Sequence, residues 1–237
     1  MTDRLESSAA TDEVAAEPSH RPFHESAHES AHESAHESAH ESAHESAHEL
    51  AHELARSADP APWELLGEEP GFQRFLTVRL RRYRMPDGRE VDWDVLGPEA
   101  GISAVTVLPL TPEGRIVTIR MFRAGPDSIV TNLPGGRVEP GEDVAVAGAR
   151  ELEEETGYTC ETLDVVGWQW SGSSSTFRKY VAIARGCRPD GKQQLDEAED
   201  CVPVELSVDA FRAELRTPGA MTGIDAAYLA LDHAGLL

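Results

Sequence analysis

The sequence predicts an α/β domain with helices layered on a mixed β-sheet, preceded by a β-hairpin and a low-complexity N-terminal tail. Three observations lead to this fold class. Residues 1–60 differ in composition from the rest, segments of alternating apolar and polar residues follow from residue 74 onward, and helical segments lie between and after them. Strands interspersed with helices pack as layers around one core. With 237 residues, the chain has room for a tail at 1–60 and one domain at 61–237.

The tail is dominated by a repeat of the tetrapeptide HESA. Few large apolar residues occur in it, so little burial can offset the entropy lost on ordering it. We expect a disordered segment or a single exposed helix, around which the histidines would spiral because four residues exceed one helical turn. Each repeated histidine precedes a glutamate: His24, His28, His32, His36, His40, His44, His48 and His52.

The histidines leave the role of the tail open. Imidazoles at positions i and i+4 can share a metal ion, so the tail could bind Zn²⁺ or Ni²⁺. Because imidazoles titrate near pH 6.5, the tail could also respond to pH. A repeat expansion that serves only as a solvated linker is the plain alternative.

Segments of alternating residues predict the strands. Two of them flank the turn Pro86-Asp87-Gly88 and should form a β-hairpin, and two more flank the turn 111–114 and should form a second strand pair. In chain order the predicted strands are Arg74–Met85, Arg89–Leu96, Ile102–Leu110, Arg115–Met121, Glu161–Trp170 and Phe177–Arg185.

The segment Asp143–Thr156 predicts a helix between the strands. It follows a glycine-rich loop and stops at Gly157, a residue type that commonly follows the last helical residue. Gly148 inside it costs about 1 kcal/mol relative to alanine, and the sequence shows no reason for it. Two short helices, Val208–Leu215 and Gly223–Ala234, should close the chain.

The net charge of −22 restricts the partners of the chain. Half of this charge lies in the tail, and the domain remains acidic, which disfavours binding to the phosphate backbone of nucleic acids. An anionic substrate therefore needs locally placed arginines, lysines or metal ions.

The cysteines and the absence of long apolar runs indicate the cytoplasm. No run approaches the roughly 20 apolar residues that span a bilayer, and the first residues lack the apolar core of a secretory signal. We therefore expect no membrane association. Cys160, Cys187 and Cys201 are odd in number and show no CxxC spacing, which fits a reducing compartment.

The stretch Gly135–Tyr158, GGRVEPGEDVAVAGARELEEETGY, carries the candidate chemistry. On a helix, Glu151, Glu154 and Glu155 share one face, because residues three and four positions apart are neighbours. Like charges at this spacing repel, and a hard divalent cation with oxygen ligands relieves the repulsion. The pattern therefore predicts a metal site.

The same stretch resembles the Nudix box, G-x5-E-x7-R-E-U-x-E-E-x-G-U, where U is a bulky apolar residue. Every required position is filled, with an aromatic residue in the last one. The matching residues are Gly136, Glu142, Arg150, Glu151, Leu152, Glu154, Glu155, Gly157 and Tyr158. The resemblance implies a Nudix-type α/β/α sandwich and a Mg²⁺-dependent hydrolase that cuts the pyrophosphate bond of a nucleoside diphosphate derivative.

The resemblance also implies the metal ligands. Glu151, Glu154 and Glu155 would bind Mg²⁺ together with the carbonyl of Gly135, and Mn²⁺ is a possible substitute. The residues expected to support the geometry of loop and helix are Glu142, Arg150 and Gly157.

A further glutamate is expected from the late acidic loop 195–200. Glu197 or Glu199 would be the catalytic base or an extra metal ligand, with an ordinary surface loop as the alternative. Substrate would be held by two arginines that can grip phosphate oxygens and by glycines and a serine in loops. The substrate-binding candidates are Arg120, Arg123, Gly135, Gly136 and Ser173, with Arg178 and Lys179 as weaker ones.

From about Phe72 onward, the chain is similar to the ADP-ribose pyrophosphatase branch of the family. This implies a nucleoside diphosphate sugar as substrate, ADP-ribose first, and a homodimer formed through the N-terminal strands. The chain departs from the branch at Gly172 and Ser173, where proline is common, and at Asn132, where glutamate is usual. The sugar pocket could therefore differ.

Other functions stay open on the sequence. A Nudix-like domain could bind a nucleotide as a sensor without cutting it, or hydrolyse dinucleotides or nucleoside triphosphates, and the tail could make the chain a metal buffer. Trp168 and Trp170 share one strand face, where they could stack on a base, although core packing is the commoner role.

Overall fold

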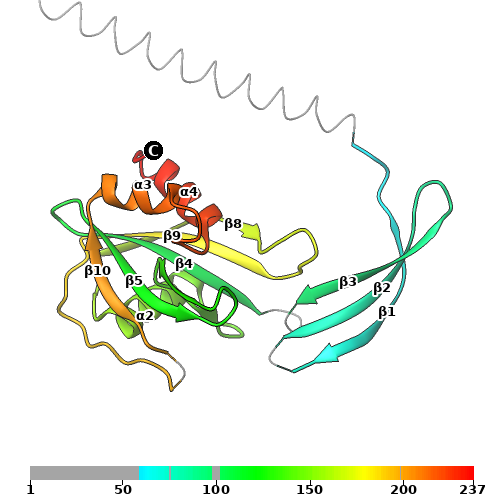
Figure 1. The fold of residues 1–237 in the computed structure, drawn as a ribbon, viewed down its shortest axis with the longest axis horizontal. Helices are drawn as coiled ribbons and strands as arrows, with labels where there is room; N and C mark the ends of the chain where they lie inside the picture. The colour runs from blue at the N-terminus through cyan, green and yellow to red at the C-terminus, as the bar shows by residue number, and fades with distance from the viewer. Residues whose placement is uncertain (1–58, 75, 98–101, 198) are drawn as a thin grey trace, which may run out of the picture. The chain divides into compact units, whose positions relative to one another are not determined.

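A computed structural model describes residues 59–237, except residues 75, 98–101 and 198 (Figure 1). The chain divides into two compact units, Met1–Ala61 and Pro62–Leu237. The predicted tail lies almost entirely outside the described residues, so its disordered or helical character stays a prediction. The second unit contains two β-sheets and the helices α2 to α4.

The larger sheet has seven strands and is mixed, as predicted. Its order is β10-β5-β4-β9-β8, with β6 beside β5 and β7 beside β4. Strands β4 and β9 run parallel, and the other neighbours run antiparallel. The strands are β4 (Ser103–Leu110), β5 (Ile116–Arg123), β6 (Ser128–Asn132), β7 (Arg137–Val138), β8 (Thr162–Trp170), β9 (Arg178–Arg185) and β10 (Val202–Leu206).

Strands β4 and β5 separate directly after their turn, which the sequence did not predict. They pair only at Leu110 and Ile116. Further along, the edge of β4 is taken by the segment that follows β6: the amide of Val107 donates to the Pro134 carbonyl and the amide of Val105 to the Gly136 carbonyl, each at 2.9 Å. The split between two neighbouring strands therefore gives the glycine loop its place in the sheet.

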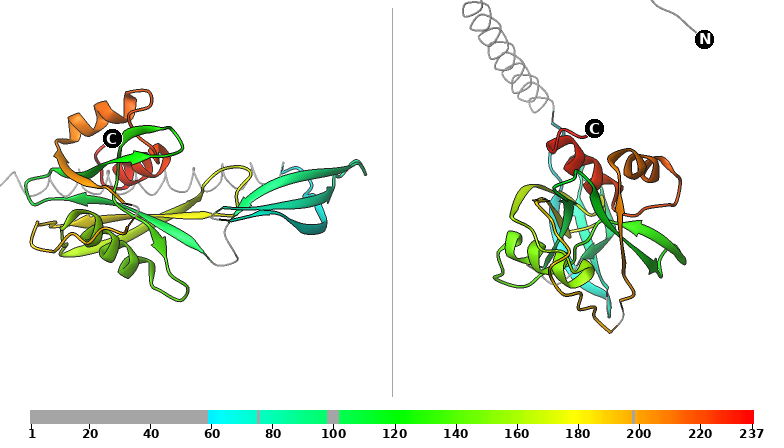
Figure 2. Two further views of the ribbon diagram at one scale, coloured as in Figure 1. Left: turned by 60° about the horizontal axis from the view of Figure 1, so that its bottom comes forward. Right: turned by 90° about the vertical axis from the view of Figure 1, so that its left-hand side faces the viewer.

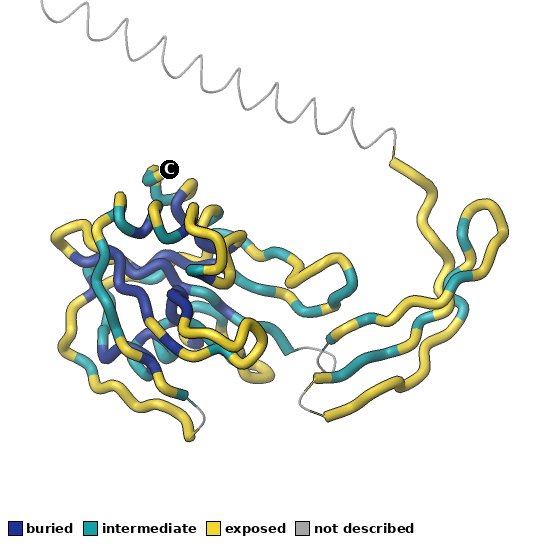
Figure 3. Tube along the Cα trace, viewed as in Figure 1, coloured by how far each residue is buried: buried dark blue, intermediate teal, exposed yellow. Residues whose placement is uncertain are grey.

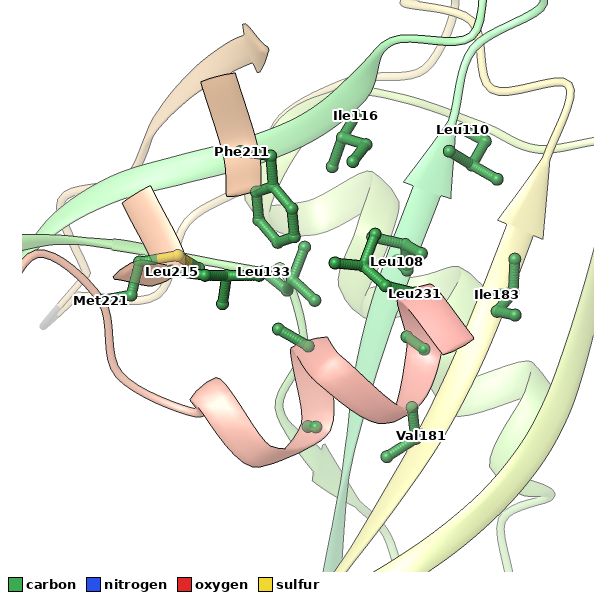
Figure 4. Close-up of a cluster of buried hydrophobic side chains, with 13 residues drawn as sticks. Leu108, Leu110, Ile116, Leu133, Val181, Ile183, Phe211, Leu215, Met221 and Leu231 are labelled. Atoms are coloured by element: carbon green, nitrogen blue, oxygen red, sulfur yellow. The ribbon is translucent and has the colours of Figure 1, made fainter. Parts of the chain in front are cut away.

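Helices cover both faces of this sheet, which makes three layers (Figure 2). Helix α2 (Val144–Thr156) lies on one face, and α3 (Val208–Arg216) and α4 (Ile224–His233) lie on the other. Alternation along the strands divides the core accordingly, because successive side chains of a strand point to opposite faces. Val105 and Val107 pack under α2, whereas Leu108 packs with Phe211 of α3 and Leu231 of α4 (Figure 4).

Helix α2 has the ends that the sequence predicts. The Asp143 side chain accepts hydrogen bonds from the amides of Ala145 and Val146, and Gly157 ends the helix with φ of 73°. Gly148, for which the sequence offers no reason, faces the sheet. A Cβ at this position would lie 3.2 Å from Leu163 and 3.3 Å from Val107. The glycine therefore lets the helix pack closely on the sheet.

The smaller sheet contains the predicted hairpin plus one strand that was not predicted. Strands β2 (Thr77–Arg84) and β3 (Glu90–Gly97) form the hairpin, and β1 (Glu64–Gln73) pairs with β2. The sequence conceals β1 because Gly67, Pro70 and Gly71 interrupt its alternation, and its register shifts near them. Most residues of this sheet are exposed or only partly buried (Figure 3).

None of the helices in the described part of the chain is long and apolar enough to cross a membrane.

Candidate active site

The loop before α2 depends on two glycines. Gly135 has φ of 150°, and a Cβ there would lie 2.1 Å from the Val105 carbonyl oxygen. A Cβ on Gly136 would lie 2.5 Å from the Glu151 carboxyl group. A side chain at Gly135 would therefore push the loop away from the backbone of the sheet, whereas one at Gly136 would displace the flexible end of the Glu151 side chain. The carbonyls of Pro134 and Gly136 accept from β4, so that of the intervening Gly135 is directed away from β4.

Glu155 joins the helix to this loop. Its Oε2 atom accepts a hydrogen bond of 2.7 Å from the Gly135 amide, and the residue is only 2% exposed. The pKa of Glu155 is raised to about 8, mainly by burial and further by the charges of Glu151 and Glu199, while the Gly135 amide and Arg123 act in the opposite direction. A buried carboxylate among other carboxylates is stabilised by a bound cation.

Arg150 gathers three carboxylates of the box around one guanidinium. It donates to Glu142 Oε1 at 3.0 Å and to Glu151 Oε1 and Glu154 Oε2, each at 2.9 Å. The hydrogen bond from Arg150, followed by that from the Glu139 amide, lowers the pKa of Glu142. Glu142 and Arg150 thus tie the loop to the helix, which fits the supporting role expected for them.

The three box glutamates lie on one side of α2, as their spacing predicts. Within the described part of the chain, no three His, Cys, Asp or Glu side chains stand close enough together to hold a metal ion as oriented. Glu151 and Glu154 point to Arg150 instead. The donor set nevertheless fits a hard cation, because it offers carboxylate oxygens, and burial raises the pKa of Glu151 as well.

The late acidic loop brings one of its two candidate glutamates to the site. Glu199 is partly buried, and its charge raises the pKa of both Glu151 and Glu155. Glu197 is exposed to solvent. The amide of Asp196 donates to Glu199 Oε2 at 3.1 Å, which holds this carboxylate within its turn.

The attachment of this loop to the site could not be predicted from the sequence. Gln193 Nε2 donates to the carbonyl of Glu155 at 2.8 Å and to that of Cys201 at 2.9 Å. The amide of Gln194 donates to the Glu154 carbonyl at 2.8 Å. These donors satisfy carbonyls at the end of α2 that have no partner within the helix. Gln193 thereby joins the end of α2 to the start of β10.

The two candidate phosphate-binding arginines lie on opposite faces of β5. Ile116 of β5 packs with α3 and α4, so Arg120, an even number of residues away, faces that side. Arg123 shares the opposite face with Ile119 and Met121, which pack against Cys201. Only Arg123 is therefore on the side of α2.

The remaining candidates lie apart from the glutamates. Ser173 is exposed in a loop whose neighbour Ser174 accepts a hydrogen bond from the amide of Leu96 at the end of β3. Lys179 is paired with Asp225 of α4 at 2.9 Å.

Core packing, the commoner role for Trp168 and Trp170, is excluded by the structure. The two residues are 44% and 50% exposed, with ring centroids 4.9 Å apart. Arg178 lies over the Trp168 ring at 4.9 Å.

Known proteins are similar to this chain in sequence and in fold. A family model described as NUDIX domain matches residues 102–223. The chain is 32% identical over 166 residues to a methanol dehydrogenase activator of Bacillus methanolicus, which covers 68% of this chain and 88% of that protein. It is also 32% identical over 108 residues to an ADP-ribose pyrophosphatase of Bacillus subtilis, covering 45% of this chain, and 33% identical over 87 residues to one of Saccharomyces cerevisiae, covering 32%.

These matches differ in how much of each relative they cover. The aligned segment spans 58% of the Bacillus subtilis pyrophosphatase and 37% of the yeast protein, less than two thirds in both cases. A solved structure described as an ADP compounds hydrolase aligns with a TM-score of 0.64 at 20% identity, covering 76% of this chain and 99% of that one. At this identity, the likeness shows the fold alone.

The family model covers half of the chain, and the structure places a complete box on a glycine loop and the helix behind it. This chain belongs to the Nudix hydrolase family.

Proposed function

We propose that this chain hydrolyses the pyrophosphate bond of a nucleoside diphosphate sugar, with ADP-ribose as the first candidate. The products would be a nucleoside monophosphate and a sugar phosphate. The observation that carries the proposal is the group of carboxylates Glu151, Glu155 and Glu199 beside the Gly135–Gly136 loop, with Glu155 buried and its pKa raised. The two ADP-ribose pyrophosphatases among the relatives support the choice of substrate.

Mg²⁺, or Mn²⁺ in its place, would be held by Glu151, Glu154, Glu155, Glu199 and the carbonyl of Gly135. A bound divalent cation neutralises pyrophosphate oxygens and lowers the pKa of a bound water. Glu155 is held in place by the Gly135 amide, and Glu151 and Glu154 are both bound by Arg150.

Glu199 rather than Glu197 would take the proton from the attacking water. It is the late glutamate whose charge acts on Glu151 and Glu155, and a general base must be within reach of the reacting centre. Arg123 would bind phosphate oxygens from the side of α2. Arg120 and Ser173 do not take part in this proposal, because they lie on the other face of β5 and in the loop beside Leu96.

A competition assay tests the substrate. The chain is offered ADP-ribose, GDP-mannose, UDP-glucose, a diadenosine polyphosphate and dGTP at equal concentrations with Mg²⁺, and each product is quantified. We expect a diphosphate sugar to be preferred. A tenfold preference for dGTP or the diadenosine compound, about 1.4 kcal/mol in transition-state binding, would overturn the assignment.

A second candidate function is the activation of a dehydrogenase. It is favoured by the methanol dehydrogenase activator, whose alignment with this chain is the longest of the three. The test adds the chain to a methanol dehydrogenase and measures alcohol oxidation, with the Glu155→Gln variant beside it. Activation by the wild type but not by Glu155→Gln would show that activation requires hydrolysis. Activation by both proteins would show that it does not.

A homodimer formed through the smaller sheet is part of the proposal. Both faces of this sheet carry large apolar side chains that are exposed, and three strands without a covered face are marginally stable. The exposed residues are Trp63, Leu65, Phe72, Leu80, Trp93 and Leu96. Light scattering of residues 61–237 at micromolar concentration should give twice the mass of one chain, and a monomer mass would exclude a stable dimer.

Two further expectations concern the tail and the compartment. Zn²⁺ or Ni²⁺ binding by the histidine repeat stays a prediction, since it falls outside the described residues. The cytoplasm stays the expected compartment, and the three cysteines are free thiols in the structure.

A further inference from the structure

Asn132 lies at the junction of β6 and the catalytic loop and is 4% exposed. Its Nδ2 atom donates to the Thr131 carbonyl at 3.0 Å and to the hydroxyl of Thr222, while its Oδ1 atom accepts from Arg123 Nε at 2.9 Å and Nη2 at 3.1 Å. A carbonyl oxygen accepts but cannot donate, so the Thr131 carbonyl determines which end of the amide faces Arg123. The buried amide therefore fixes the guanidinium through two hydrogen bonds.

The side chain that holds Arg123 is neutral, so this contact does not cancel the charge of the guanidinium. Arg150, on the helix, is surrounded by Glu142, Glu151 and Glu154. Arg123 forms no salt bridge with any carboxylate of the described residues. Since Asn132 uses two of the five N–H donors of the guanidinium, three remain for a ligand.

Arg123 is placed to act on the same space as the catalytic carboxylates. It shares a strand face with Ile119 and Met121, which pack against Cys201. The Cys201 thiol lies 3.9 Å from Glu155 Oε1. Consistent with this placement, Arg123 lowers the pKa of Glu155.

We propose that Asn132 is a positioning and specificity residue, which holds Arg123 as a full positive charge for the diphosphate group of a nucleotide. This inference rests on the proposed function and adds to it the residue that sets the charge of the phosphate subsite. A carboxylate at position 132 would pair with Arg123 and cancel most of the charge that a diphosphate would meet. A carboxylate would also lack the N–H group that donates to the Thr131 carbonyl, and its oxygen would repel that carbonyl oxygen.

A mutant cycle on Asn132 and Arg123 tests the inference by binding rather than by turnover. Calorimetry measures the affinity of the full chain for ADP in the presence of Mg²⁺, for the wild type, Asn132→Asp, Arg123→Ala and the double variant. We expect Asn132→Asp to weaken ADP at least tenfold in the wild-type background and less than twofold in the Arg123→Ala background. Such dependence of one substitution on the other measures coupling between the two residues.

Thr222→Ala is the matched control, because it removes a partner of the same amide on the side away from Arg123. It should change ADP affinity less than twofold. If Asn132→Asp melts below the assay temperature, Asn132→Ala replaces it in the same cycle, with the same expected dependence on Arg123.

An equal loss in both backgrounds would overturn the inference, since Asn132 would then act on the fold and not through Arg123. Wild-type protein that binds no ADP with Mg²⁺ would also overturn it. Wild-type protein that binds ADP but leaves ADP-ribose uncut would refute the proposed substrate, and the cycle would still decide the role of Asn132.

Discussion

The amide of Gly135 and the carboxylate of Glu155 are joined by a hydrogen bond of 2.7 Å between the glycine loop and the catalytic helix. Twenty residues separate the two in the chain. Gly135 must remain glycine for the loop to lie against Val105, and Glu155 is buried where the loop and the helix meet. Through this bond, the backbone of the loop positions the most buried carboxylate of the site.

The Glu155→Gln variant should fold, but its activity should fall at least about a hundredfold. This is the upper end of the loss seen when a residue that only supports a metal ligand is replaced. The amide oxygen of glutamine can still accept from Gly135, but a neutral side chain binds a divalent cation weakly. Glu154→Gln should also lose most of its activity. Turnover and circular dichroism are measured at saturating Mg²⁺, with the exposed Glu161→Gln as control. Near wild-type turnover in both variants would show that the metal site is assigned wrongly.

The stability of the metal-free chain should fall as pH rises from about 5 to about 8. The pKa of Glu155 in the folded chain is about 8, above its ordinary value of 4.5, mainly because of burial. The fold therefore favours the protonated carboxyl group, so this contribution to stability is fully present below pH 4.5 and is lost as pH rises through 8.

Thermal melting in a chelating buffer across this pH range measures the effect. In the Glu155→Gln variant, the melting temperature should depend much less on pH. The dependence that remains should come from Glu151, whose pKa is also raised. Added Mg²⁺ should raise the melting temperature more at pH 8 than at pH 6, because it binds the ionised carboxylates. Identical slopes for wild type and Glu155→Gln would contradict the prediction.

Gln193→Ala should lower kcat by about tenfold, within the range found for groups that orient a site residue. The variant removes the donor that joins the Glu155 and Cys201 carbonyls and so releases the loop that carries Glu199. Gln194→Ala is the matched control, since Gln194 contacts the helix through its backbone amide. Equal kinetics for the two variants would show that the Gln193 side chain does not position the loop.

Deletion of residues 1–56 should leave kcat/KM and the melting temperature of the domain nearly unchanged. The tail has few apolar residues, and the compact unit with the box begins at Pro62. Calorimetry and steady-state kinetics of the shortened chain provide the measurement. A large loss in either quantity would mean that the tail packs on the domain.

Patterns within single segments of the sequence explain which helices and strands could be predicted. Helical spacing places Glu151, Glu154 and Glu155 on one face of α2. The ends of α2 follow from Asp143 and Gly157, which contact backbone groups only a few residues away. The longer strands other than β1 follow from alternation in the same way. Strands β6, β7 and β10 have two to five residues each, too few for alternation to be recognised.

The sequence by itself determined the family and the helix that carries the glutamates of the box, because each depends on spacing along one segment. Only the tertiary structure shows that Glu199 lies near Glu151 and Glu155 while Glu197 is exposed, and that Arg123 rather than Arg120 is on the side of α2. It also revealed the contact of Asn132 with Arg123 and that of Gln193 with the helix end. These relationships join residues from different strands and loops, and their distances depend on how the sheet splits between β4 and β5. At that split β4 pairs with β9 and with the segment after β6, which are distant from it in the sequence, so no single segment encodes it.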